Sequence, residues 1–328
     1  MSDEIIENLG PLAALAGTWE GDKGIDFSRI KSKETATKYR ERILFEPLGP
    51  VNNGPQKLYG LRYSMIRDSV FNHYPEMKFM YNGYLQENKL SHTFGNTVDF
   101  VDEHFYLKDL SILYNKYDSI DPACKKICVA EYATSPNGNG GNEIGNFRGA
   151  LGDAVFMLGC EKNSERIWWT GYGNYAGFVG HANFGPCIVW NDAVSSFASP
   201  SFYMQKILFT DNAGTRILPF TQYTDSCFWS ASVDTESGKN DILLKVANKK
   251  GTPETVNITL KGANKVNPVG HSTVLTGGLD AENSISEPTK VIPSTGTFTP
   301  GSAFTYTFPA NSVSVLRIEI LKYDPDSE

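Results

Sequence analysis

The sequence lacks any apolar run of the roughly 20 residues that a membrane-spanning helix needs, so no membrane partner is expected. It also lacks a basic excess, because 37 Asp and Glu outnumber 30 Lys and Arg and give a net charge of −7. Phosphate binding needs a basic surface, so nucleic acid is not an expected partner either. The first ten residues, MSDEIIENLG, lack the apolar core of a signal peptide. This predicts a cytoplasmic protein, with a secreted origin of the later part of the chain left open.

Cysteine is scarce, and its spacing matches no zinc pattern. The five residues are an odd number, and neither a second pair nor a His cluster completes a site with Cys124 and Cys128. We therefore expect reduced, mostly buried thiols, no metal site and no other cofactor. Hydrophobic residues make up 40% of the chain and charged residues 20%, which is typical of a folded protein rather than a disordered one.

Three stretches of the chain differ in their patterns. Residues 1–67 predict a short helix and then strands that are split by Pro47, Pro50 and the turn Asn52-Asn53-Gly54-Pro55. Residues 68–190 alternate apolar runs with a helical pattern at 147–160, which predicts βα units and a parallel sheet. The predicted parallel strands are 77–81, 98–106, 126–132 and 166–172. Four strands are half of an eight-stranded βα barrel.

Residues 191–328 predict a helix at 201–209 and then an antiparallel β-sandwich or jelly roll. The predicted strands are 227–233, 241–247, 255–260, 272–275, 303–308 and 313–320. The expected fold class is therefore mixed α/β plus all-β. A partial βα barrel is followed by a β-sandwich and preceded by a short β-barrel-like fragment.

Polar side chains gather where the predicted parallel strands end. His104 and Tyr106 end one strand, Glu131 ends the next, and Trp169 lies in the one after it. In βα barrels the carboxyl ends of the strands carry the chemistry, so these four residues are candidates to line one cleft. Carboxylates, a His, a Tyr and a Trp face are what a glycosidase site needs. The alternative is ordinary: a Glu at a strand end is usually solvated, and a lone His is usually a core residue with its hydrogen bonds satisfied.

Several strings between about residues 70 and 320 carry a family resemblance. They are DFVDEHFY, YDSIDPACKKICVAEYA, GALGDAVFMLGCEKNSERI, ASPSFYMQKILF, VLTGGLDAENSISEPTKVIP and FTYTFPANSVSVLRIEI. This region resembles the C-terminal part of the α-L-arabinofuranosidases of glycoside hydrolase family 51. The resemblance implies a retaining enzyme that releases terminal α-L-arabinofuranosyl groups from polymers such as arabinan or arabinoxylan. It places Glu131 as the nucleophile and His104 and Tyr106 at the active site. Trp169 would be a stacking platform, and a homo-oligomer is possible.

The resemblance stops short of the second carboxyl that a retaining enzyme needs. In the family, that acid/base belongs to an Asn-Glu pair on an earlier strand, which has no counterpart here. Asn142 and Glu143 imitate the pair but follow Glu131 in a loop, and Asp102 and Glu103 have no better claim. Residues 171–177 also depart from the family pattern. The alternative is thus an inactive remnant that binds carbohydrate or serves a structural role.

Two strings near the N-terminus, PLAALAGTWEGDKGID and FEPLGPVNNGPQKLYGLRYS, carry a different resemblance. They are similar to the start of a heme-binding-like β-barrel family, akin to nitrobindin and the fatty-acid-binding proteins. None of the five His lies in a context that matches the heme ligand of that family. A small-ligand or heme-binding barrel is therefore a third alternative, with no heme expected, and a junction between the two resemblances falls near residue 67.

Overall fold

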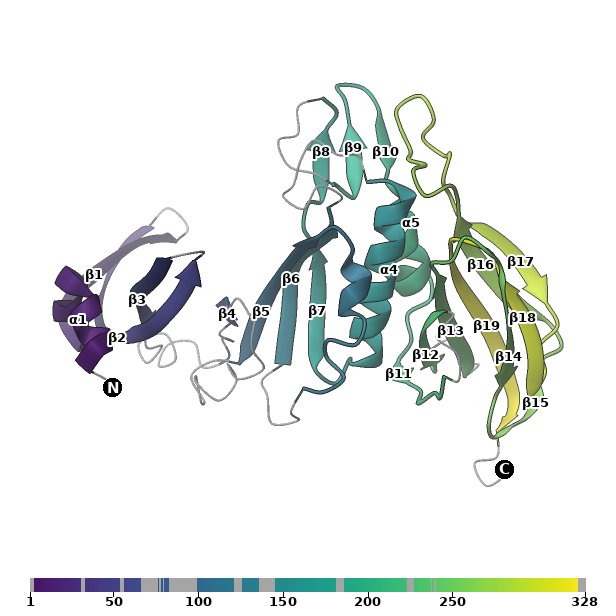
Figure 1. The fold of residues 1–328 in the computed structure, drawn as a ribbon, viewed down its shortest axis with the longest axis horizontal. Helices are drawn as coiled ribbons and strands as arrows, with labels where there is room; N and C mark the ends of the chain where they lie inside the picture. The colour runs from purple at the N-terminus through teal and green to yellow at the C-terminus, as the bar shows by residue number, and fades with distance from the viewer. Residues whose placement is uncertain are drawn as a thin grey trace. The chain divides into compact units, whose positions relative to one another are not determined.

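Figure 1 shows a computed structural model of the chain, which forms two compact units. The first unit comprises Met1–Phe79 and Phe94–Asp99, and the second comprises Met80–Thr93 and Phe100–Glu328. The structure describes residues 3–30, 33–53, 56–65, 76, 78, 80–82, 99–120, 126–135, 145–180, 186–222, 227–236, 238 and 240–323.

The first unit is a three-stranded antiparallel sheet preceded by short helices. The helices are α1 (Asp3–Asn8) and the 3-10 helix η1 (Gly10–Leu15), and the strands are β1 (Gly17–Ile30), β2 (Lys33–Asn53) and β3 (Gln56–Met65). The strand order is β1-β2-β3, with both pairs antiparallel. A helix followed by strands was predicted here, whereas the likeness to heme-binding barrels stays a prediction.

The break predicted at Pro47 and Pro50 is wrong, because β2 continues through both prolines, whereas the strand does end at Asn53, within the predicted turn. Pro47 still pairs with Leu61 of β3, and the register then shifts between Leu48 and Val51. A proline cannot donate to the ladder, and an irregular pairing removes the need for that donor at Pro50. Proline therefore marks an irregularity in this strand and not its end.

A four-stranded parallel sheet begins the second unit. Its strands are β4 (Met80–Asn82), β5 (Phe100–Leu107), β6 (Lys126–Thr134) and β7 (Ile167–Tyr172), in that order. Helix α4 (Phe147–Lys162) connects β6 to β7. All four predicted strands are present and parallel, and the helix begins at the predicted residue.

The next segment holds three short strands and a helix that changes type. The strands are β8 (Ala176–Phe178), β9 (Val189–Asn191) and β10 (Ser196–Ala198), with β8 and β9 parallel and β10 antiparallel to β9. Helix α5 (Pro200–Gln205) then continues as a π-helix, η4 (Lys206–Thr210). Together α5 and η4 cover the helix predicted at 201–209.

The rest of the chain is antiparallel β structure. One sheet follows the path β11 (Arg216–Ile217), β12 (Phe228–Asp234), β13 (Asp241–Asn248), β19 (Ser312–Tyr323), β16 (Gly270–Thr276) and β17 (Ser294–Phe298), and β15 (Ala263–Val266) also pairs with β19. A second sheet holds β14 (Glu254–Thr259) and β18 (Ala303–Phe308). The six predicted strands are present, whereas β11, β15 and β17 were not predicted. The unit is thus mostly β-sheet with few helices.

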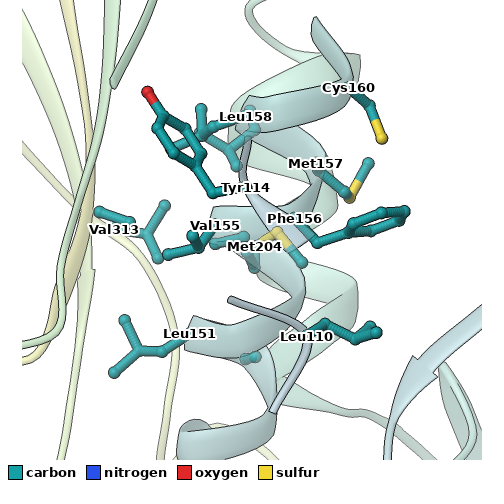
Figure 2. Packing of buried hydrophobic residues seen from close by; sticks show 14 of the residues in the cluster. Leu110, Tyr114, Leu151, Val155, Phe156, Met157, Leu158, Cys160, Met204 and Val313 are labelled. Carbon is teal, nitrogen blue, oxygen red and sulfur yellow. The ribbon is translucent and has the colours of Figure 1, made fainter. Parts of the chain in front are cut away.

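Helix α4 forms the centre of the core of the second unit (Figures 1 and 2). Every residue from 147 to 160 except Arg148 is buried, because the helix has neighbours on several sides. Phe156 packs against Tyr132 of β6, and on the opposite side of the helix Val155 lies near Val313 of β19 (Figure 2). This core contains residues from both sides of the boundary predicted at residue 190. The division into parts 1–67, 68–190 and 191–328 stays a prediction. No helix in the described ranges is long and apolar enough to cross a bilayer.

Gly159 lets α4 approach the chain at Tyr114 closely. A Cβ on residue 159 would lie 2.4 Å from the carbonyl oxygen of Tyr114, and backbone atoms cannot move aside as a flexible side chain can. We expect Gly159→Ala to lower the free energy of unfolding by about 1–3 kcal/mol in urea titrations. Gly149→Ala on the same helix is the control, because its new Cβ would meet atoms only at 3.8 Å. It should be neutral or stabilising by up to about 1 kcal/mol, and an equal loss in both variants would contradict this explanation.

Candidate active site

Three of the four predicted site residues lie together at the ends of β5 and β6. The hydroxyl of Tyr106 donates a hydrogen bond to Oε2 of Glu131 at 2.9 Å. Nδ1 of His104 lies 3.4 Å from the same oxygen, and His104 pairs directly with Glu131 across the two strands. The Glu131 side chain is 45% exposed, so the carboxylate is open to a ligand from solvent.

Glu131 reaches this face because β6 contains an extra residue. Ile127, Val129 and Tyr132 all belong to the core around α4, so the two-residue alternation of the strand shifts once between Val129 and Tyr132. Both neighbouring strands show the same shift, as a β-bulge requires. The pairs that define it are Asp102↔Cys128 followed by His104↔Glu131, and Val129↔Thr170 followed by Tyr132↔Tyr172. Without this bulge, Glu131 would point into the apolar core.

Asp102 also belongs to the cluster, and sequence reasoning did not assign it a role there. Its Oδ2 accepts from Nε2 of His104 at 2.8 Å, and its Oδ1 accepts from the backbone N–H of Ala130 at 3.0 Å. Strand alternation was the available signal, because it places Asp102, His104 and Tyr106 on one face of β5.

Glu103 lies on the opposite face of β5, away from the cluster. Its carboxylate accepts from the hydroxyl of Tyr117 at 2.6 Å and is 3.1 Å from Nζ of Lys116. Burial raises the pKa of Glu103, although both partners oppose that shift. Glu103 is therefore bonded within the buried side of the sheet and cannot act on a ligand beside Glu131.

Tyr106 is held between Glu131 and the backbone of Gly173. Burial raises the pKa of Tyr106, and the hydrogen bond to Glu131 raises it further, so the hydroxyl keeps its proton and acts as a donor. A Cβ on residue 173 would lie 2.3 Å from the Tyr106 oxygen, which only a glycine avoids. The N–H of Gly173 donates to the carbonyl of Tyr132 at 2.8 Å. Bare backbone at Gly173 thus lies against the tyrosine, and the departure of residues 171–177 from the family pattern stays a prediction.

Trp169 lies further down the same face. It pairs with Cys128, three residues before Glu131, and its side chain is hydrogen-bonded to the Cys128 thiol. Burial raises the pKa of Cys128 to about 11, so the thiol is protonated at neutral pH. The neighbouring Trp168 stacks on Phe100 with ring centroids 4.1 Å apart. The ring of Trp169 reaches the position of Gly171, where a Cβ would lie 3.0 Å from its Cζ3 and 2.6 Å from the carbonyl oxygen of Ala130. That Trp169 lines one cleft with Glu131, and that it is a stacking platform, both stay predictions.

The described cluster offers one available carboxylate. Asp102 already accepts two hydrogen bonds and is buried, and Glu103 faces away. Asn142 and Glu143, which imitate the acid/base pair of the family, fall outside the described residues. Within those residues no group of three or more His, Cys, Asp or Glu side chains is arranged to hold a metal ion. The chemistry that this arrangement allows is nucleophilic attack by Glu131 or hydrogen bonding to a polar ligand.

Comparisons with known proteins agree on one family. The family model of the alpha-L-arabinofuranosidase C-terminal domain matches residues 129–312. Alpha-L-arabinofuranosidase 1 of Arabidopsis thaliana is 26% identical over 286 residues, which cover 82% of this chain and 41% of that protein. The arabinose-bound structure of MgGH51 α-L-arabinofuranosidase is 28% identical with a TM-score of 0.67, covering 76% of this chain and 41% of that one.

A more distant structure shows the same fold. The α-L-arabinofuranosidase of Thermotoga maritima, in its arabinose complex, is 18% identical with a TM-score of 0.61 and covers 76% of this chain and 59% of that one. The chain thus spans about two-fifths of the length of the Arabidopsis relative and of MgGH51. It belongs to the family of the α-L-arabinofuranosidase C-terminal domain, the C-terminal part of glycoside hydrolase family 51 enzymes.

Proposed function

We propose that this chain carries the nucleophile of a retaining glycosidase site for terminal α-L-arabinofuranosyl groups. The observation that carries the proposal is the placement of Glu131, which is exposed and contacted by Tyr106 and His104 through one oxygen. Membership of the family and the arabinofuranosidase names of the relatives support the choice of sugar. The substrate would be an arabinofuranosyl-containing oligo- or polysaccharide such as arabinan or arabinoxylan.

The reaction begins with a displacement at the anomeric carbon. Both contacts of Glu131 fall on Oε2, so Oε1 supplies the electron pair that forms the new C–O bond. The glycosidic C–O bond breaks, and its electron pair leaves with the aglycone oxygen, which takes up a proton. Water then attacks the glycosyl ester, releases arabinose with retained configuration and restores the carboxylate.

The arrangement of the fold bears on where the proton donor would be. In this proposal strands β4–β7 are the C-terminal half of an eight-stranded βα barrel, and the antiparallel sheets after them form the β-sandwich domain. A retaining site needs its two carboxyls about 5–5.5 Å apart. The described residues hold only Glu131 in a suitable place, so the proton donor would come from elsewhere in the chain or from another chain in an oligomer.

A single-turnover assay tests the nucleophile without needing the proton donor. An aryl α-L-arabinofuranoside with a good leaving group can form the glycosyl-enzyme unaided, so the folded protein should release a burst of phenol and gain the mass of one pentosyl group. Glu131→Gln keeps the size of the side chain and removes the nucleophilic charge, so it should show neither signal. A burst of equal size in Glu131→Gln would refute the role of Glu131.

The second candidate function is carbohydrate binding without turnover, favoured by the single available carboxylate in the described cluster. Removing one of two essential groups usually leaves little catalysis, because such residues act as a unit. In this case a protein shown to be folded by circular dichroism gives no burst but still binds arabino-oligosaccharides in calorimetry. Loss of that binding in Tyr106→Phe would place the ligand at the same cluster.

A further inference from the structure

Asp102 is a buried carboxylate whose two hydrogen bonds both lead to Glu131. The residue is 3% exposed, and a carboxylate so far from water needs its charge compensated by donors. One donor is the backbone of Ala130, the residue directly before Glu131. The other is the ring of His104, which lies against the Glu131 carboxylate.

The first hydrogen bond holds the bulge that turns Glu131 toward the site. The extra residue of β6 lies between Val129 and Tyr132, where both neighbouring ladders are irregular. A bulge leaves a backbone N–H without its ladder partner, and a buried unpaired N–H is costly. Oδ1 of Asp102 accepts from Ala130 at this position, so the carboxylate takes the place of the missing ladder acceptor.

The second hydrogen bond places a proton on Nε2 of His104. An ionised carboxylate can only accept, so the nitrogen facing Oδ2 of Asp102 must be Nε2–H. The ring then presents Nδ1 to Oε2 of Glu131, on the side where Tyr106 also donates.

We propose that Asp102 is a positioning residue for Glu131. It acts through the Ala130 N–H to fix the bulge and through Nε2–H of His104 to fix the tautomer and orientation of the ring. It does not touch the sugar. The proposal rests on the proposed function only for the catalytic role of Glu131, since the two hydrogen bonds stand without it.

A spectroscopic test reads the His104 ring directly. Long-range ¹⁵N–¹H correlation spectra of the full chain show which ring nitrogen bears the proton, and His104→Gln identifies the His104 signals among the five His residues. The wild type should show a protonated Nε2. In Asp102→Asn, the amide oxygen can accept from the Ala130 N–H only if the NH₂ group turns toward His104. Because NH₂ donates, the Nε2 that faces it must accept, so Nε2 should lose its proton and Nδ1 should carry one.

Glu103→Gln is the matched control, because it neutralises an equally buried carboxylate on the same strand that faces the other way. It should leave the His104 spectrum unchanged. An unprotonated Nε2 in the wild type would overturn the proposal, and this measurement does not depend on any variant folding. An unchanged tautomer in folded Asp102→Asn would overturn it as well.

The rate of Glu131 labelling by the activated arabinofuranoside gives a second measurement. A misplaced nucleophile can cost about 100-fold, so Asp102→Asn should be labelled about 100-fold more slowly, while Glu103→Gln stays close to the wild type. Equal rates in Asp102→Asn and the wild type would refute the link to Glu131. If the wild type itself is not labelled, the proposed function fails, and the His104 spectra still decide the role of Asp102.

Discussion

Replacing Lys245 by methionine is expected to lower the free energy of unfolding by about 3–5 kcal/mol, a large share of a typical total of about 5–15 kcal/mol. Lys245 on β13 is fully buried and paired with Glu161 near the end of α4. Ser230 donates to the other oxygen of Glu161, and Nζ of Lys245 lies 4.6 Å from the ring centre of Phe209. Burial lowers the pKa of Lys245, and Glu161 opposes that shift. Removing the lysine leaves the Glu161 carboxylate nearly buried and without its cationic partner.

The design that isolates this pair is a double-mutant cycle measured by urea titration. Lys245→Met with Glu161→Gln removes both charges, so the double variant should lose less stability than the sum of the two single variants. The control pair is Lys249 with Asp109, which are also bonded, at 2.7 Å, but are partly exposed. A surface pair contributes only about 0–1 kcal/mol, so Lys249→Met should cost little. Strictly additive losses at Lys245 and Glu161 would show that the pair is not coupled.

The pair matters because it joins the parallel sheet to the antiparallel one through α4. The sequence predicted this helix well, because its apolar positions recur at helical spacing and its start follows Asn146, whose side chain accepts from Gly149 as an N-cap does. Such signals are local. The partner of Glu161 lies 84 residues away on another sheet, and no local pattern indicates which buried Lys meets which buried Glu.

Strands were predictable where apolar residues dominate and were missed where they do not. Strands β15 (ANKV) and β17 (STGTF) contain few apolar residues and form by pairing with β19 and β16. Pairing partners far along the chain decide such strands, so propensity alone could not find them. The unbroken β2 has the same cause, since β3 pairs with it at Pro47 and Leu48 and again from Val51 onward.

The candidate site was predicted in part, and the missing part depends on register. His104, Tyr106 and Glu131 were found because they stand where parallel strands end. Simple alternation, however, places Glu131 on the same side as Ile127 and Val129, in the core. Only the extra residue in β6 reverses this, and a bulge has no signature in the sequence VAEYA.

Asp153 illustrates how the core supports the strand that carries Glu131. Its Oδ1 accepts from the backbone N–H of Thr134 at the end of β6, and its Oδ2 accepts from the hydroxyl of Ser201 at the start of α5, both at 2.7 Å. Burial raises the pKa of Asp153 from 3.8 to about 6, although these hydrogen bonds oppose the shift. The folded state therefore binds a proton at Asp153 more tightly than the unfolded chain does.

The sign of the pH dependence follows from this difference. Below about pH 4 the group is protonated in both states, and its favourable contribution is fully present. As the pH rises from about 4 to about 6, the unfolded chain releases this proton while the folded state keeps it, and about 3 kcal/mol of stability is lost by the time the folded state also titrates. Asp153→Asn cannot titrate, so the stability of the variant relative to the wild type should improve by about that amount between pH 4 and pH 7.

Urea titrations across this pH range measure the difference directly, and contributions from other titrating groups cancel between the two proteins. Asp280→Asn is the control, because Asp280 is exposed, with 82% of its side chain accessible, and its ion pair in the described structure is with Arg148, whose side chain is 52% accessible. It should follow the wild-type pH profile. A constant difference between Asp153→Asn and the wild type would mean that Asp153 stays ionised throughout. In that event the hydrogen bonds from Thr134 and Ser201 outweigh the cost of burying the charge. The end of β6 is then held by an ionised Asp153.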